Sequence, residues 1–304
     1  MGGMNVSALL LWSTLGWASD TIAVLRSDDL PAYQMPVDRY VAELEGQDVE
    51  VFDLLGDKQR ALRIAAQLRA DPPPLVLALG PKAAWIAVNE LPDVPLVYAM
   101  VFSPQRYGII DGVTGVSMDV PPELVLAQLD LMFPDLKRLG IVLGAESNPT
   151  WLPAVVAAAE LAGFSLQIRR ITTDQRIRQT LGQLRPEIDA LWLMPEPSLL
   201  TPSGYHTLYT EALRTNLPIL AYSESLVRAG ALMCLAPDYD DVGRLAAHLS
   251  RQILAGKDPD RINTVPPEAF RVVLNEDTKE ALQLDLDPIL LDFVDEVVTA
   301  PPRR

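Results

Sequence analysis

The 304-residue chain is long enough for one large domain or two ordinary ones, and with 49% hydrophobic residues it is globular and not disordered. Its net charge of −15 argues against nucleic acid as a partner, because the phosphates would be repelled. We interpret this acidity as a source of solubility and not as a sign of a cationic substrate.

The first 18 residues are predicted to be a signal peptide. Val6 to Trp17 is mostly apolar and too short to span a bilayer comfortably, and Gly16-Trp17-Ala18 is a small-x-small cleavage signal. The segment before the apolar run contains no Lys or Arg, whereas a signal peptide normally begins with positive charges. A start of the chain at another position is therefore an alternative. No Cys follows the run, so a lipid anchor is not expected. We therefore predict cleavage after Ala18 and export to the periplasm.

From Asp20 onward, short apolar runs alternate with amphipathic segments. Strands are predicted at 21–25, 49–54, 75–79, 94–100, 139–143, 165–171, 190–194, 219–221 and 271–274. Helices are predicted around 37–44 and at 57–70, 80–88, 122–133, 151–161, 174–184, 205–214 and 238–255, with a short one near 289–297.

This alternation predicts an α/β protein with parallel sheets covered by helices on both faces. The chain has too many such units for one compact sheet, and an extended break at Val113–Val120 separates two similar sets. Two doubly wound parallel-sheet lobes are therefore expected.

The stretch from Pro218 to Gly256 carries the most specific pattern. It contains Ile-Leu-Ala-Tyr-Ser-Glu-Ser, then Ala-Gly-Ala-Leu, then Pro-Asp-Tyr and Val-Gly-Arg-Leu-Ala-Ala. Asp238 is the expected N-cap of a long amphipathic helix, and Gly256 stands where a C-terminal glycine belongs. These runs resemble the ABC-transporter substrate-binding proteins of the tryptophan and tyrosine type, over about residues 20–295.

The resemblance implies the type I periplasmic binding protein fold, in which two lobes joined by a hinge close around a small solute. It implies that the helix from Asp238 returns to the first lobe. The expected division is a signal peptide at 1–18, a first lobe at 19–116 plus 237–262, a second lobe at 117–236 plus 263–298, and a frayed tail at 299–304. The hinge is expected near Ser117, Ala236 and Thr264.

No sequence motif indicates a catalytic centre. A nucleophile elbow, a P-loop and a dinucleotide-binding glycine motif are all absent from the sequence. His206 and His248 lack a partner at metal-ligand spacing, and Cys234 is expected to be a buried apolar residue. Asp238-x-Asp240-Asp241 superficially resembles the metal-binding motif of a glycosyltransferase, but helix capping explains the same residues without a metal and is the preferred interpretation. No enzyme activity, cofactor or metal is expected.

The candidate ligand-binding residues follow the strands, because ligands of parallel sheets collect at the carboxyl ends of strands. Aromatic residues there supply a wall or simply pack, and charged residues bind a solute group or are simply solvated. The candidates are Asp28, Tyr33, Gly80, Pro81, Lys82, Phe102, Ser103, Asn148, Trp151, Glu196, Tyr222 and Glu224.

Three loops depart from the residues typical of the resembling family: Gly80-Pro-Lys-Ala-Ala84, Phe102-Ser-Pro104 and Met194-Pro-Glu-Pro197. The solute is therefore an amino acid or an altered small anion or aromatic acid. The expected function is the solute-binding component of an ABC importer, monomeric and docking on an inner-membrane permease. The alternatives are a sensor or scaffold protein of the same fold and, more weakly, a glycosyltransferase-like enzyme.

Overall fold

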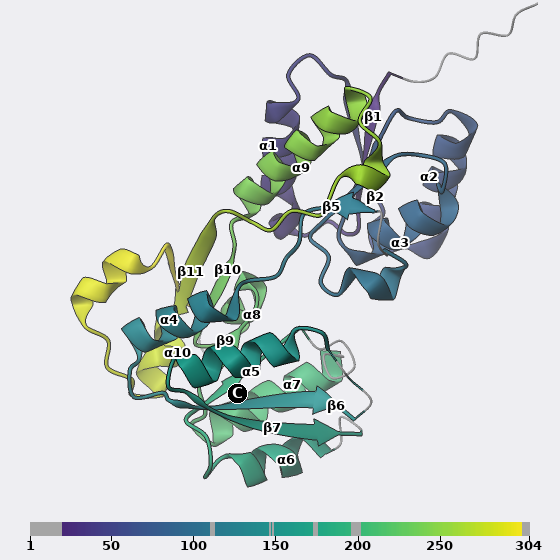
Figure 1. Cartoon of the computed structure of the whole chain (residues 1–304). Coiled ribbons are helices and arrows are strands. Elements are labelled where there is room, and N and C mark those ends of the chain that lie inside the picture. The colour runs from purple at the N-terminus through teal and green to yellow at the C-terminus, as the bar shows by residue number, and fades with distance from the viewer. Residues whose placement is uncertain are drawn as a thin grey trace, which may run out of the picture.

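The computed structural model describes residues 20–109, 113–145, 147, 149–172, 176–195 and 202–299. The predicted signal peptide lies outside these residues. In the described part the chain forms two α/β lobes, each built around its own sheet. Figure 1 shows them as an upper and a lower body joined by extended segments.

The first lobe contains a five-stranded parallel sheet in the order β2-β1-β3-β4-β5. Its strands are β1 Ile22–Arg26, β2 Val49–Asp53, β3 Val76–Leu79, β4 Leu96–Ala99 and β5 Thr114–Gly115. Its helices are α1 Gln34–Glu43, α2 Lys58–Ala70, α3 Pro81–Glu90 and α9 Tyr239–Leu254, and the short 3₁₀ helices are η1 Pro31–Tyr33, η2 Pro104–Tyr107 and η4 Pro259–Arg261.

The second lobe contains a seven-stranded sheet in the order β12-β11-β10-β9-β8-β6-β7. Its strands are β6 Arg138–Gly144, β7 Ser165–Ile171, β8 Ala190–Trp192, β9 Ile219–Ala221, β10 Met233–Pro237, β11 Phe270–Asn275 and β12 Glu296–Val298. Its helices are α4 Pro122–Met132, α5 Leu152–Leu161, α6 Ile177–Leu184, α7 Pro202–Arg214, α8 Glu224–Arg228 and α10 Glu276–Ala281, followed by the 3₁₀ helix η5 Pro288–Phe293.

The apolar runs form strands because both faces of the first sheet are covered. Side chains alternate along a strand, so Leu77 and Leu79 enter one core cluster while Val76 and Ala78 enter the cluster on the opposite face. All four residues of β3 are buried. Covered on both sides, such a strand is continuously apolar instead of alternating with polar residues.

The long helix α9 packs on α1 in the first lobe, as the resemblance implied. The Asp238 side chain caps it by accepting from the Asp240 N–H. Val242, Leu245 and Leu249 enter the same core cluster as the residues of α1. Figure 1 shows α9 (light green) lying against α1 (purple), although the two helices are far apart in sequence.

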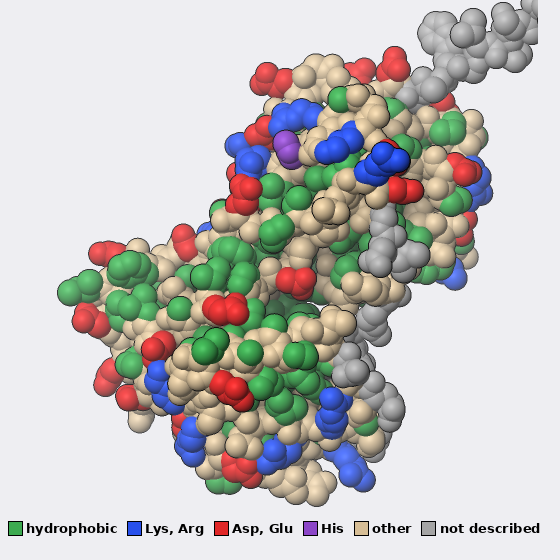
Figure 2. All heavy atoms as spheres, viewed as in Figure 1, with side chains coloured by type: hydrophobic (Ala, Val, Ile, Leu, Met, Phe, Trp, Pro, Cys, Tyr) green, Lys and Arg blue, Asp and Glu red, His purple; other side chains and the backbone are tan. Residues whose placement is uncertain are grey.

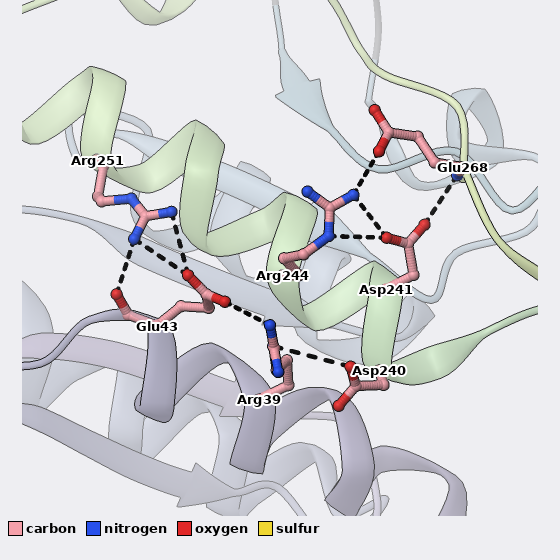
Figure 3. A network of polar contacts seen from close by, with 7 residues as sticks. All are labelled: Arg39, Glu43, Asp240, Asp241, Arg244, Arg251 and Glu268. Carbon is pink, nitrogen blue, oxygen red and sulfur yellow. Dashed lines mark hydrogen bonds and ion pairs between the residues drawn. The ribbon is translucent and has the colours of Figure 1, made fainter.

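Ion pairs line one edge of this helix pair (Figure 3). The Glu43 carboxylate of α1 accepts from Arg39 at 2.7 Å and from Arg251 of α9 at 3.2 Å. Toward the start of α9, Asp241 accepts from Arg244 at 2.7 Å and from the Glu268 N–H at 2.8 Å. The second group attaches α9 to the segment that leads back to the second lobe.

Three segments cross between the lobes. The first follows β5 and the third precedes β11, and a parallel bridge between Val116 and Val265 joins these two. The second follows β10, and the Asp238 N–H donates to the Ala269 carbonyl of the third crossing at 2.9 Å. The crossings are thus hydrogen-bonded to one another and not independent tethers.

Two features differ from the sequence prediction. The second sheet is not purely parallel, because β10 and β11 pair antiparallel where the chain returns from the first lobe. The short helix predicted near 289–297 is confirmed only in its first half. Pro288–Phe293 is a 3₁₀ helix, and Glu296–Val298 is a strand, β12, that pairs with β11. Pairing with the free edge of β11 outweighs the helical pattern of this segment.

Candidate functional site

A cavity of about 1330 Å³ opens where the two lobes meet. The carboxyl ends of β4 in the first lobe and of β6, β7, β8 and β9 in the second lead into it, as expected for a ligand site of parallel sheets. Parts of the first and third crossings complete its lining. Figure 2 shows hydrophobic side chains gathered over the region between the lobes.

Aromatic side chains form much of the wall. Phe102 of the first lobe and Tyr222 of the second meet edge to face, with ring centroids 5.0 Å apart and planes at 74°. Trp151 and Trp192 also line the cavity from the second lobe. An aromatic wall with a few polar groups is the usual make-up of a small-molecule site.

The segment that follows β4 has an unusual backbone. Met100 (φ 59°) and Ser103 (φ 52°) both adopt the left-handed conformation, which non-glycine residues rarely take. They flank Val101 and Phe102, which line the cavity. Strain of this kind, at a cost of about 1–3 kcal/mol per residue, is concentrated at ligand sites.

A polar group of residues lies where the crossings pass the cavity: Tyr98, Ser117, Asp119 and Thr264 all line it. The Tyr98 and Thr264 hydroxyls are 3.1 Å apart, and the Ser117 hydroxyl donates to Asp119 Oδ2 at 2.7 Å. Burial raises the pKa of Tyr98, the bond to Thr264 lowers it, and the nearby charge of Asp119 raises it further. The net pKa lies above the ordinary tyrosine value, so this phenol stays neutral.

Four of the candidate residues named from the sequence line this cavity: Phe102, Ser103, Trp151 and Tyr222. Asn148 and Glu196 lie outside the described residues. The remaining candidates do not line the cavity: Asp28, Tyr33, Gly80, Pro81 and Lys82 of the first lobe, and Glu224 of α8. Ligand contact remains a prediction for each of them.

Five first-lobe candidates gather at the ends of β1 and β3, apart from the lining residues of the cavity. Lys82 Nζ lies 3.5 Å from Asp28 Oδ2, and both side chains are about half exposed. Gly80 permits a close approach, since a Cβ there would lie 2.3 Å from the Tyr33 hydroxyl. Pro81 is the first residue of α3.

Glu224 is placed in an ion-pair network beside the crossings. Its Oε1 accepts from Arg271 at 3.2 Å, and Arg271 and Arg228 also approach Glu296. Burial raises the pKa of Glu224, Arg271 lowers it, and Glu296 raises it. The net pKa lies above the ordinary value. This carboxylate already has cationic partners in the structure, which differs from an acid held ready for a solute ammonium group.

The sequence prediction missed Tyr98, Asp119 and Trp192 as lining residues. Tyr98 and Trp192 lie within apolar strands, where the pattern indicates core packing. Asp119 lies on a crossing that was considered only as a hinge. The available signal was its position two residues after Ser117, between the two βα sets.

Within the described ranges, no group of three or more His, Cys, Asp or Glu side chains could hold a metal ion. The Asp238–Asp241 cluster is engaged in capping and ion pairs. Cys234 is buried as predicted, and burial raises the pKa of its thiol. None of the helices in the described ranges has the length and apolar character needed to cross a bilayer.

Two α/β lobes, three crossings and an interlobe cavity define the type I periplasmic binding protein fold, a class of solute-binding proteins. The chain matches the family described as ABC transporter substrate binding protein over residues 42–298. It therefore belongs to the ABC-transporter substrate-binding proteins, which are binding proteins and not enzymes.

The similar proteins agree with this assignment. The chain is 24% identical over 230 residues to a tyrosine-binding protein from Clostridioides difficile (strain R20291), a match that covers 73% of this chain and 66% of the relative, just under two thirds. Among solved structures, an ABC domain in complex with L-Trp from Streptococcus pneumonia has a TM-score of 0.69 and 20% identity, covering 91% of this chain and 99% of that one.

A second solved structure is ligand-free and open. It is a substrate-binding protein with adhesive properties from Clostridium difficile, with a TM-score of 0.72 and 21% identity, covering 93% of this chain and 100% of that one. At these identities the structural likeness establishes the fold and not the solute.

Proposed function

We propose that this chain is the periplasmic solute-binding component of an ABC importer, and that it binds an amino acid or related small molecule in the interlobe cavity. The observation that carries the proposal is the cavity itself, of about 1330 Å³, to which both lobes contribute aromatic side chains. The tyrosine-binding relative and the structure in complex with L-Trp support an amino acid as the solute.

The mechanism is closure of the lobes around the solute. The first lobe comprises 19–116 plus 237–262 and the second 117–236 plus 263–298, with bending near Ser117, Ala236 and Thr264. Few backbone torsions need to change, because the crossings are short and hydrogen-bonded together. A solute that contacts both lobes stabilises the closed form, which docks as a monomer on an inner-membrane permease.

A thermal-shift screen tests the proposal. Residues 19–304 are unfolded and refolded to remove any carried-over solute, and then heated with amino acids, aromatic acids, amines and small anions. A solute at about a thousand times its dissociation constant stabilises the folded state by roughly 4 kcal/mol, a clear shift in melting temperature. A hit supports solute binding. No shift across the whole panel contradicts it.

A second candidate function is sensing or scaffolding by the same fold. The observation that favours it is that the loop from Gly80 to Lys82 lies apart from the lining of the cavity, and that Pro81, at the first position of α3, has no backbone N–H to offer a solute. Deleting the gene separates the two functions. An importer component is needed for uptake of its solute, whereas a sensor is needed only for the response to it.

A further inference from the structure

We propose that the cavity selects solutes that carry an ammonium group, with Asp119 as the counter-ion, and that a solute carboxylate is dispensable. This inference rests on the proposed solute-binding function and narrows it. The solutes expected from the sequence are an amino acid and a small anion or aromatic acid, and the inference favours the first, because it carries an amine.

The charge distribution of the lining leads to this view. Among the described residues that line the cavity, Asp119 is the only one with a charged side chain, and Lys, Arg and His are absent from that set. Lys82, the candidate partner for a solute carboxylate, instead lies beside Asp28 and outside the lining. The described part of the cavity thus has one fixed negative charge and no fixed positive charge.

Asp119 is held in place by hydrogen bonds and not by a cationic side chain of the described residues. Its N–H donates to the Ser117 hydroxyl oxygen at 3.0 Å, and that hydroxyl donates to Oδ2 at 2.7 Å. Within the described part of the chain, Asp119 belongs to no ion pair, and these hydrogen bonds leave Oδ1 available. The carboxylate is exposed at the cavity. An exposed, positioned and uncompensated carboxylate can accept a charge-assisted hydrogen bond from an ammonium group.

The aromatic residues of the lining suit the same solutes. An aromatic ring face attracts an organic cation and repels an anion, and Trp151 and Tyr222 are the half-buried aromatic residues that the second lobe contributes to the lining. Tyr98 stays neutral in this setting, so it adds no charge of its own to the cavity. A cation with an apolar or aromatic body therefore suits the described lining.

The test is isothermal titration calorimetry with three compounds on one indole body: tryptamine (a cation), tryptophan (a zwitterion) and indole-3-acetate (an anion). A phenyl series of phenethylamine, phenylalanine and phenylacetate repeats the comparison. We expect each amine to bind at least as tightly as its amino acid, and each acid at least about tenfold more weakly, because a charge-assisted hydrogen bond is lost.

Asp119→Asn keeps the shape and removes the charge, and it should weaken amine binding at least about tenfold while leaving acid binding unchanged or improved. Asp93→Asn is the matched control. It removes one negative charge from an exposed turn outside the lining and should leave binding unchanged. Circular dichroism and the melting temperature of each variant check that the fold is retained.

The outcomes separate this inference from the proposed function. Tightest binding by the acids overturns the inference, as does amine binding that Asp119→Asn leaves unaltered. If neither series binds but another solute of the thermal-shift panel does, the inference fails and the proposed function stands. If nothing in the panel binds, both fail.

Discussion

Asp241 illustrates how one buried carboxylate attaches a helix to a crossing segment. It is 8% exposed and accepts hydrogen bonds from the N–H groups of Glu268 and Ala269 and from Arg244. We expect Asp241→Asn to lower the free energy of unfolding by about 1–3 kcal/mol, because hydrogen bonds to a charged acceptor are lost. Urea denaturation at pH 7 measures it.

The effect should depend on pH. Burial raises the pKa of Asp241, but the hydrogen bonds from the two N–H groups and from Arg244 together lower it by more. The net pKa therefore lies below the ordinary value. The stabilisation is therefore complete above the unfolded pKa of about 3.9 and is lost as the pH falls through the folded pKa. The gap between wild type and variant should be constant from pH 7 to 5 and close in more acidic buffer.

Asp240→Asn is the control for this prediction. Asp240 is on the same turn, but its side chain is 51% exposed and its ion pair with Arg39 is long, at 3.7 Å. Its removal should change stability by less than about 1 kcal/mol. Equal losses at the two positions would mean that general charge, and not the local hydrogen bonds, accounts for the effect.

For single residues, the sequence predicted the candidate site only in part. Residues within a few positions of a strand end, such as Phe102 and Tyr222, could be found because parallel strands bring their carboxyl ends to one edge. Glu224 could not be judged, because its partner Arg271 is 47 positions away. Asp119 was missed because crossings have no periodic pattern that shows which side chains enter the cavity.

The packing of α1 on α9 depends on a glycine. A Cβ at Gly243 would lie 2.4 Å from the Pro36 carbonyl oxygen and 2.9 Å from the Pro36 Cα. Backbone cannot yield as a flexible side chain does, so Gly243→Ala must push the two helices apart. We expect a loss of about 1–3 kcal/mol in the free energy of unfolding, typical of overpacking, measured by thermal or urea denaturation.

Gly182→Ala is the matched substitution in another helix. Gly182 lies in α6, and a Cβ at this position would meet no atom within 4 Å beyond the backbone of its own helix and its chain neighbours, among the described residues. Alanine should therefore stabilise the protein by about 0.5–1 kcal/mol through its better helix propensity. The two substitutions are chemically identical, so opposite signs identify contact with α1 as the cause. A shared sign would contradict this.

Regular elements were predicted well where local sequence and tertiary setting agree. The strands at Ser165–Ile171 and Ile219–Ala221 have the predicted bounds, and Asp57 and Asp238 cap the helices that follow them. The segment at 294–298 was predicted wrongly, because local spacing does not reveal that β11 has a free edge. Val297 and Val298 pair with Leu274 and Asn275 on that edge, where β-branched residues suit a strand.

The arrangement of the two lobes leads to a prediction for the whole molecule. If a solute bridges them, small-angle scattering should show a smaller radius of gyration at saturation, because the lobes approach each other. Addition of a compound that fails in the thermal-shift screen is the control. Identical curves with and without a bound solute would mean that binding does not close the cavity.

The return of α9 to the first lobe also bears on how the protein acquires its structure. Tyr40 of α1 bonds Ser250 of α9 across 210 positions, so the first lobe cannot complete its core until most of the chain has been made. Contacts this distant in sequence slow folding. While the chain is being made, the apolar side of α1 therefore stays uncovered, and this hydrophobic surface remains exposed to water until α9 follows.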